Sequence, residues 1–107
     1  MLTRKRVETI STDLTITGQN EPDITFGVTY RNLTGKQFDE ALNITSSDTN
    51  RPQFDLVGGV MRLVEKWDSE YALTPEGLQQ AEDDRAGILH AVIQGFHVAR
   101  RVKLVGN

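Results

Sequence analysis

Hydrophobic and polar residues alternate along the first third of the chain. In residues 13–17, Leu14 and Ile16 fall on one face of an extended chain, with polar side chains on the other. Residues 24–31 continue this alternation, and one face carries the larger apolar and aromatic side chains: Ile24, Phe26, Val28 and Tyr30. A period of two is typical of a strand that buries one face. The pattern therefore predicts two such strands.

The segment between these strands has the composition of a turn. It contains Gly18, Asn20 and Pro22, which favour a connection longer than two residues. We predict an antiparallel β-hairpin over residues 7–32. Because an isolated hairpin is only marginally stable in water, the rest of the chain must cover its Phe26 face.

Apolar spacing changes to three and four from residue 35 onward, which is typical of amphipathic helices. Thr34 is a candidate N-cap for a first helix, whose apolar stripe is Phe38, Ala41 and Leu42. Residues 44–52 form a polar loop ending at Pro52, which fits the first position of a second helix. Its apolar positions are Leu56, Val57, Val60, Leu63, Val64 and Trp67.

Gly58 and Gly59 interrupt the second predicted helix. Each costs about 1 kcal/mol relative to alanine in a helix. Two explanations stay open: close approach of a neighbouring backbone, or a bend.

Trp67 continues the apolar stripe of the second helix by one turn, so we expect it at the end of the core face. Tyr71 and Leu73 can then fold back over the indole. Thr74 and Pro75 have the residue types of an N-cap and first helical position, which predicts a short third helix. Trp67 is interpreted as a core residue, and the alternative is contact with a ligand or partner.

A last helix is predicted from a cap at Asp83 or Asp84 through about Lys103. Its wide apolar stripe consists of Ile88, Leu89, Val92, Ile93, Phe96 and Ala99. Arg100 and Arg101 complement the negative end of the helix dipole. This stripe either closes the core or binds a partner.

These elements predict an α+β fold, in which an N-terminal antiparallel β-hairpin packs against a C-terminal bundle of three to four helices. The length of 107 residues suits one domain over residues 1–107. We expect residues 1–6 to be a disordered basic N-terminus, residues 7–32 the hairpin, and residues 35–104 the helical part. An exposed edge on the strand over residues 24–32 could pair with a second chain.

Composition narrows the classes of function. The chain has no cysteine, which excludes disulfides and thiolate metal sites. Its net charge of −3 argues against nucleic-acid binding driven by overall charge. Neither an apolar run long enough for a membrane span nor a secretory signal is present, so we expect a soluble, intracellular protein.

Candidate chemistry is sparse. His90 and His97 are seven residues apart, whereas a metal pair on one helix uses a spacing of three or four. The acidic clusters at residues 39–40 and 82–84 lie near expected helix ends and polar faces. No nucleophile elbow, phosphate loop or dinucleotide motif occurs. We therefore expect no enzyme activity, no metal and no cofactor.

Two basic clusters remain, over residues 3–6 ("TRKR") and residues 99–103 ("ARRVK"). Either could contact phosphate, but no nucleic-acid-binding module surrounds them. Complementing a helix dipole or binding an acidic protein patch is the favoured interpretation, and nucleic-acid binding is unlikely.

The order of motifs resembles one family. A β segment, "ITFGVTYRNLT", precedes a helix with "FDEAL"; an amphipathic stretch then runs into a tryptophan, "LVGGVMRLVEKWD", and a helix start, "LTPEGLQQ", precedes a closing helix. Across residues 13–103 this is similar to the tail assembly chaperones of long-tailed bacteriophages and prophages. The clusters "TRKR" and "ARRVK" have no counterpart in that pattern.

The resemblance implies a non-enzymatic protein that binds the tape-measure protein, keeps it soluble and helps recruit tail tube protein. It implies a location in the cytoplasm of the bacterial host and absence from the mature virion. Family members often have a longer form made by ribosomal frameshifting. A homo-oligomer is also plausible, because a chaperone for long helical chains needs an exposed apolar surface.

Two other functions compete with this one: a small structural tail component or adaptor retained in the virion, and a small nucleic-acid-binding regulator. For partner binding, the expected residues are those that combine apolar or aromatic area with nearby charge: Trp67, Tyr71, Phe96, Arg100 and Arg101.

Overall fold

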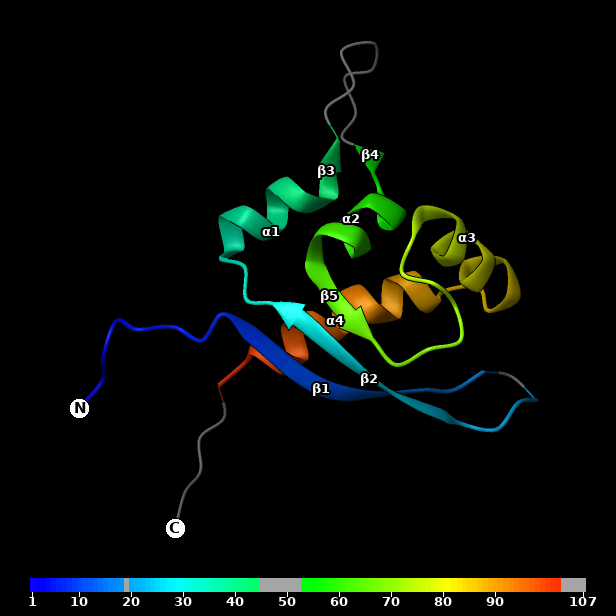
Figure 1. The fold of residues 1–107 in the computed structure, drawn as a ribbon, viewed down its shortest axis with the longest axis horizontal. Helices are drawn as coiled ribbons and strands as arrows, with labels where there is room; N and C mark the ends of the chain where they lie inside the picture. The colour runs from blue at the N-terminus through cyan, green and yellow to red at the C-terminus, as the bar shows by residue number, and fades with distance from the viewer. Residues whose placement is uncertain (19, 45–52, 103–107) are drawn as a thin grey trace.

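In the part of the chain that the structure describes, a three-stranded antiparallel sheet and four helices make up the core of the fold (Figure 1). The computed structural model describes residues 1–18, 20–44 and 53–102. The sheet contains β1 (Thr9–Ile16), β2 (Ile24–Arg31) and β5 (Val64–Trp67), in the order β1-β2-β5. The helices are α1 (Gly35–Leu42), α2 (Leu56–Leu63), α3 (Pro75–Asp84) and α4 (Ile88–Arg100). The predicted α+β class, with an N-terminal hairpin against a helical part, is confirmed.

Strands β1 and β2 form the predicted hairpin with an unbroken register from Thr9↔Arg31 to Ile16↔Ile24. Phe26, Val28 and Tyr30 are buried beneath the helices, as the alternation predicts. The opposite face is polar, and hydroxyl pairs bridge it between Ser11 and Thr29 at 2.9 Å and between Thr15 and Thr25 at 2.8 Å. One face of the sheet is therefore core, and the other is open to solvent.

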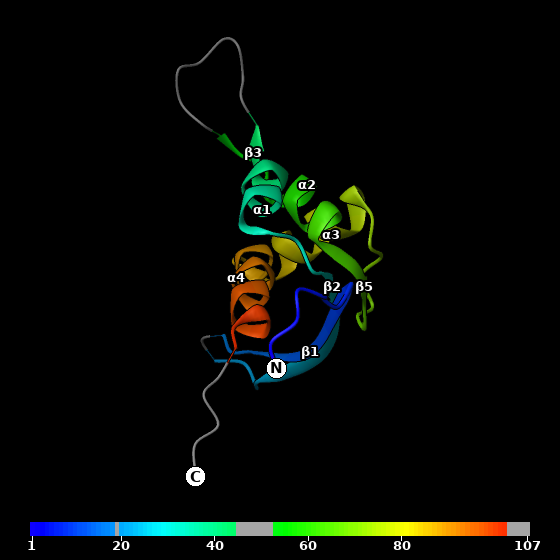
Figure 2. The same ribbon diagram turned by 90° about the vertical axis from the view of Figure 1, so that its left-hand side faces the viewer.

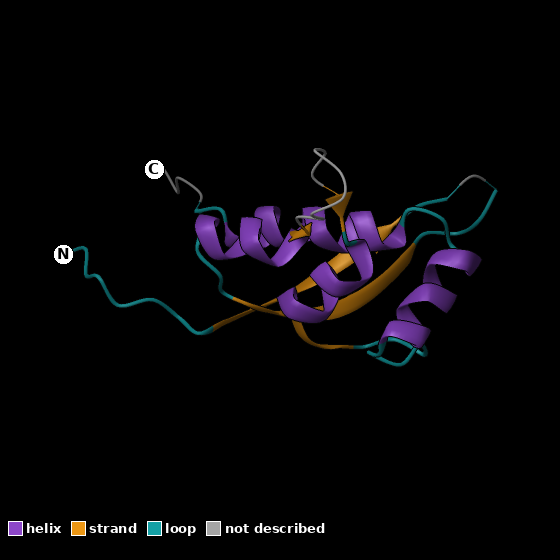
Figure 3. Cartoon of the chain, turned by 90° about the horizontal axis from the view of Figure 1, so that it is seen from above, coloured by secondary structure: helices purple, strands orange, loops and turns teal. Residues whose placement is uncertain are grey.

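Helix α4 packs along the apolar face of the sheet (Figure 2). Its Phe96 ring stacks on Phe38 of α1 with the ring centroids 5.2 Å apart, and meets Tyr30 of β2 edge-on at 5.7 Å. These three rings join the sheet to the first and last helices. The two long strands pass beneath the helices when the molecule is viewed from above (Figure 3).

The second helix is shorter than predicted. It ends at Leu63, and Val64–Trp67 form strand β5 on the second edge of β2. Trp67 therefore lies opposite Val28 in the sheet and not on a helix. Three- and four-residue spacing over so short a segment cannot tell a helix from a buried strand. The edge of β2 that faces away from β1 carries backbone N–H and C=O groups, and pairing with β5 satisfies them. This pairing favours a strand over a longer helix.

The last helix starts later than predicted. Asp83 and Asp84 belong to α3, and α4 begins at Ile88 after Gly87, whose φ of 95° is a left-handed value that favours glycine. The carboxylate that accepts hydrogen bonds from the first amides of α4 is Glu82, at 2.6 Å from Gly87 N and 3.2 Å from Leu89 N. Helix α4 ends at Arg100 and not near Lys103, which lies outside the described residues.

The other helix starts match the expected residue types in two cases out of three. Thr34 and Gln37 exchange hydrogen bonds at the start of α1, and Thr74 accepts one from Gly77 N at the start of α3. Helix α2 begins at Leu56 with Asp55 as its cap, whose Oδ1 accepts from Gly58 N at 2.9 Å. The prediction that Pro52 opens this helix is therefore wrong.

The segment before α2 is framed by two short strands. β3 (Asn43–Ile44) pairs with β4 (Gln53–Phe54), and the predicted loop between them, residues 45–52, lies outside the described residues. A Cβ on Gly59 would overlap the end of the Leu42 side chain of α1, whereas the nearest backbone atom, the Ala41 carbonyl oxygen, would lie 3.9 Å away. A side chain, and not a neighbouring backbone, therefore packs against this glycine.

The N-terminal residues 1–8 have no regular secondary structure. The Arg6 guanidinium donates a hydrogen bond to the Asn32 carbonyl at 2.9 Å, and the Asn32 amide donates to the Val7 carbonyl at 2.9 Å. No helix of the described ranges is both long and apolar enough to cross a bilayer.

The buried hydroxyl of Tyr30 makes the fold sensitive to alkaline pH. Tyr30 donates to the Val92 carbonyl of α4 at 2.6 Å, and burial raises the pKa of its hydroxyl. Below about pH 10 the tyrosine is neutral in both states, and above it only the unfolded state ionises readily. The free energy of unfolding should therefore decrease as pH rises above about 10, by up to about 1.4 kcal/mol per pH unit for this group.

Urea unfolding of the wild type and of Tyr30→Phe between pH 8 and pH 11 measures this dependence. The variant should be less stable at pH 8, because it lacks the hydrogen bond, and should lose less stability at alkaline pH. Tyr71→Phe measures the separate contribution of the other tyrosine, whose pKa is also raised, by the hydrogen bond that its hydroxyl donates to Asp84. Tyr30→Phe should remove more of the pH dependence than Tyr71→Phe, because only the Tyr30 hydroxyl is buried. If Tyr30→Phe lost stability with rising pH as steeply as the wild type does, Tyr30 would not be the source of the pH dependence.

Candidate functional site

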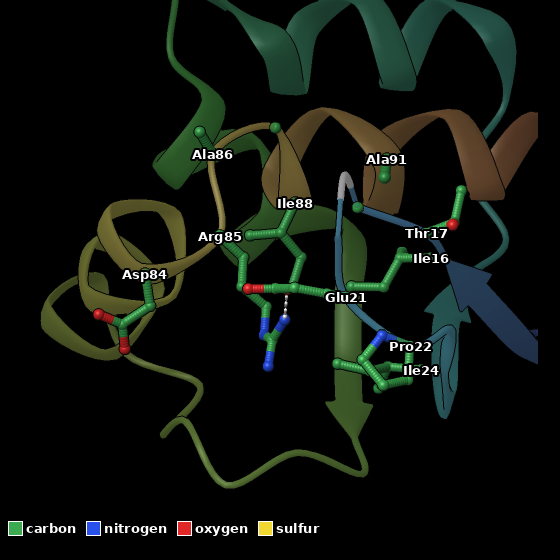
Figure 4. A pocket seen from close by; sticks show the side chains of 12 residues that line it. Ile16, Thr17, Glu21, Pro22, Ile24, Asp84, Arg85, Ala86, Ile88 and Ala91 are labelled. Atoms are coloured by element: carbon green, nitrogen blue, oxygen red, sulfur yellow. Dashed lines mark hydrogen bonds and ion pairs between the residues drawn. The ribbon is translucent and has the colours of Figure 1, made fainter.

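A depression lies between the closed end of the β-hairpin and the turn that joins α3 to α4 (Figure 4). It has a volume of about 280 Å³, and a second depression of about 280 Å³ adjoins it on the β5 side. Ile16, Ile24, Arg85 and Ile88 line both. We call the two together the tip groove.

The floor of the tip groove is apolar. Ile16 and Ile24 are the last register pair of the hairpin, so their side chains stand side by side on its inner face. Ile88, the first residue of α4, faces them from the opposite wall, and Ala91 follows one turn later (Figure 4). Ile16 and Ile24 remain half-buried, which leaves apolar area open to a ligand.

The rim is charged. Arg85 donates to the Glu21 carboxylate at 2.7 Å and so links the hairpin turn to the α3–α4 turn across the groove (Figure 4). Both side chains are substantially exposed, so this ion pair contributes little to stability. Asp84, Asp68 and Glu70 complete the lining, and carboxylates therefore outnumber cations around the opening.

The loop between β5 and α3 forms the outer wall. The indole Nε1 of Trp67 donates to the Tyr71 carbonyl at 3.0 Å, and the Tyr71 hydroxyl donates to Asp84 at 2.8 Å. The hydrogen bond to the Asp84 carboxylate is the main cause that raises the pKa of Tyr71. These two bonds fix the loop against both β5 and α3.

The groove also exposes part of a strand edge. Gly27 of β2 accepts a hydrogen bond from Asp68 N at 2.8 Å, so the odd-numbered residues of β2 direct their backbone groups towards β5. Strand β5 pairs only with Val28–Tyr30, and Thr25 lies beyond it in the wall of the second depression. The backbone N–H and C=O of Thr25 therefore face the groove.

This arrangement suits binding of a polypeptide segment. The apolar floor can accept an aliphatic side chain, the Thr25 backbone can hydrogen-bond to an extended chain, and the acidic rim favours basic residues beside it. Phe26 is part of the groove lining and meets the Trp67 indole edge-on, with the ring centroids 6.1 Å apart.

The five residues predicted to bind a partner separate into two groups. Tyr71 lines the tip groove, and Trp67, half-buried in β5, holds its outer wall. Phe96 is fully buried in the core and has no exposed surface for a partner. Arg100 covers the Phe96 ring at 5.9 Å from its centroid, and Arg101 caps α4 at the far end of that helix.

The histidines do not converge. His90 and His97 are both exposed on α4, and the His97 ring packs edge-on against Phe38 with centroids 4.5 Å apart. In the ranges that the structure describes, no group of three or more histidine, aspartate or glutamate side chains could hold a metal ion.

Sequence reasoning missed the groove residues Glu21, Arg85 and Ile88. The missing information was the position of the break between α3 and α4, which the sequence placed at Asp83 or Asp84. Arg85 was therefore expected inside the last helix and not in a turn that opposes the hairpin. Gly87 was the available signal, because glycine commonly marks the end of a helix.

A second surface feature lies at the end of the molecule where the two termini emerge (Figure 1). Both basic clusters are there, carried by the segment before β1 and by the end of α4: Arg4, Lys5, Arg6, Arg100 and Arg101. Exposed apolar side chains accompany them, namely Val7, Val98 and Val102.

No protein-family model, curated protein or solved structure matches this chain.

Proposed function

We propose that the protein is a tail assembly chaperone of a long-tailed bacteriophage or prophage, which binds the tape-measure protein and assists assembly of the tail tube without catalysing a reaction. The tip groove is the observation that supports this proposal most directly. The order of sequence motifs described above supports it independently.

The chemistry of the groove fits such a client. A tape-measure protein that has not yet been assembled is a long chain with exposed apolar side chains, which need cover to stay soluble. The floor formed by Ile16, Ile24 and Ile88 can bury one such side chain at a time. The surrounding carboxylates favour segments in which lysine or arginine flanks the apolar residue.

The chaperone acts in the cytoplasm of the bacterial host and leaves before the virion is mature. The competing function, a small structural component of the tail, predicts the opposite location. Mass spectrometry of purified particles separates them, because a chaperone is absent from the particle and a structural component is present in stoichiometric amounts.

Ile24→Thr tests the groove. This change keeps a β-branched side chain in the strand but removes apolar area from the floor. We expect the affinity for the tape-measure protein of the same phage or prophage to fall by about 4- to 15-fold, from the loss of one or two buried methylene equivalents. The measurements are the soluble fraction of co-expressed tape-measure protein and the dissociation constant by calorimetry.

Val7→Thr is the matched control, because Val7 is exposed far from the groove. Glu70→Lys is a second groove variant that leaves the core untouched, since Glu70 is exposed on the rim. It should weaken binding of a basic segment, and more strongly at low salt. Equal binding by the wild type and both groove variants would overturn the assignment of the tip groove.

A further inference from the structure

Strand β1 is an edge strand. The sheet order is β1-β2-β5, and no strand in the described part of the chain lies beyond β1. The strand β2, whose edge we expected from the sequence to be open for another chain, is instead central and is flanked on both sides. The long uncovered edge of the sheet therefore belongs to β1.

The register shows which backbone groups point outward. Asn32 N donates to the Glu8 carbonyl at 3.0 Å, which makes Glu8↔Asn32 a hydrogen-bonded pair of the ladder. Because such pairs alternate in an antiparallel ladder, the even-numbered residues of β1 bond to β2. The outward-facing N–H and C=O groups are those of Thr9, Ser11, Asp13 and Thr15.

This edge has few of the features that prevent strand addition. The register of β1 with β2 has no bulge, and the strand contains no proline and no lysine. Its single charge, Asp13, lies on the polar outer face. On the inner face Ile10 and Leu14 are only half-buried, whereas their register partners on β2, Tyr30 and Phe26, are buried.

Helix α4 adds an apolar flank beside the same edge. A Cβ on Gly95 would lie 2.6 Å from Leu14 Cδ2, so this side of α4 rests directly on β1. Ala91 and Val98 lie within about 60° of Gly95 around the helix. Val98 is 62% exposed. The edge and this flank form one surface that combines unsatisfied backbone groups with apolar side chains.

We propose that a second copy of the chain covers this surface by antiparallel pairing of β1 with β1 about a two-fold axis at Thr12. The three-stranded sheet then becomes a continuous six-stranded sheet. Thr9 pairs with Thr15 of the other copy and Ser11 with Asp13, so every outward-facing N–H and C=O of the strand finds a partner. On the inner face Ile10 meets Leu14 across the axis.

Other registers would join the same outward-facing backbone groups, but two of them, with the axis at Asp13 or at Ser11, are less favourable. An axis at Asp13 would place the two Asp13 carboxylates opposite each other, which is unfavourable. An axis at Ser11 would leave Thr15 without a partner in the other copy's strand and would place Leu14 opposite Glu8. The axis at Thr12 instead places Asp13 opposite the Ser11 hydroxyl, which can donate a hydrogen bond to it.

Exchanging charges at positions 11 and 13 tests the pairing and its register together. Ser11→Asp places two pairs of like charges across the interface, and the dimer dissociation constant should rise by about 2- to 30-fold. Ser11→Lys places a lysine opposite Asp13 at two symmetry-related positions, and the dimer dissociation constant should fall by a factor in the same range. The double variant Ser11→Asp with Asp13→Ser should return close to the wild-type value. Sedimentation velocity at low salt, up to ~200 µM protein, measures all four.

Both positions face solvent in the single chain, and the Ser11–Thr29 hydroxyl pair is exposed. Melting curves recorded at a protein concentration low enough to keep every variant monomeric should therefore agree to within a few degrees and exclude misfolding as the cause. A wild type and Ser11→Lys variant that both stay monomeric at the highest concentration would overturn the proposal. A dimer that is indifferent to these charges, or that both Ser11→Asp and Ser11→Lys weaken, would assign the contact to another surface or register. The assay needs no client protein, so its result is independent of the proposed chaperone function.

Discussion

Replacing Phe96 with alanine should lower the free energy of unfolding by about 3–5 kcal/mol, the range for deleting a buried aromatic side chain. Phe96 is fully buried and contacts rings from two other elements, Phe38 of α1 and Tyr30 of β2. Its removal opens a cavity at the point where the sheet, the first helix and the last helix meet. Urea unfolding followed by circular dichroism measures the loss.

Gln94→Ala is the control on the same helix, because Gln94 is exposed, and it should change the stability by no more than about 0.5 kcal/mol. This comparison separates the two roles that the sequence left open for Phe96. A core residue destabilises the isolated protein when truncated. If Phe96→Ala instead left the stability near that of Gln94→Ala, the side chain would have to be reassigned to a partner-facing role.

Gly77→Ala should destabilise the protein by about 1–3 kcal/mol or more, the range for overpacking a tightly fitted site. A loss of stability would be informative, because replacing glycine with alanine inside a helix normally raises the stability by about 1 kcal/mol. In α3 a Cβ on Gly77 would overlap the carbonyl oxygen of Ala72 and lie 2.8 Å from its carbonyl carbon. Backbone atoms cannot rotate away as a side chain can, so the loop before α3 must move.

Gly35→Ala is the matched control, since Gly35 also opens a helix and a Cβ there would meet no atom within 4 Å. It should be neutral or stabilising by up to about 1 kcal/mol. Both melting temperatures can be measured by differential scanning calorimetry. The loop displaced by Gly77→Ala carries Tyr71, so this variant should also weaken client binding at the tip groove. Equal stabilities for the two alanine variants would show that α3 and the loop are not in close contact.

Much of the hairpin and of α3 could be predicted because local signals there agree with one another. Ile24, Phe26 and Val28 alternate with polar residues, and only a strand with one buried face satisfies that order. Thr74 and Pro75 specify a helix start through their own hydrogen-bonding and φ preferences. In such segments the tertiary structure agrees with the conformation that the local sequence already favours.

The misassigned segments are those where two structures fit the same pattern. Val64 and Trp67 satisfy a helical stripe and a short buried strand equally well, and the open edge of β2 selected the strand. The sequence predicted a break before the last helix but placed it at Asp83 or Asp84, whereas the turn lies at Arg85–Gly87. Asp83 and Asp84 are good cap residues by type, and the weaker local signal, Gly87, marks the actual position.

The candidate groove could not have been found from the sequence for the same reason. Ile16 and Ile24 were predicted as strand residues, but their wall partner, Ile88, comes from the other end of the chain. The fold separates the predicted partner-binding residues. Tyr71 lines the groove and Trp67 holds the loop that carries it, whereas Phe96 lies in the core.

The sequence by itself determined where one face of each element is apolar, that Thr34 and Thr74 cap α1 and α3, and that the class is α+β, because these depend on interactions between residues a few positions apart. Only the tertiary structure decided which edge of the sheet is covered, where helix gives way to strand, and which apolar residues remain at the surface. Those outcomes depend on hydrogen-bonding groups and contacts brought together from distant parts of the chain, as Arg85 and Glu21 are across the groove.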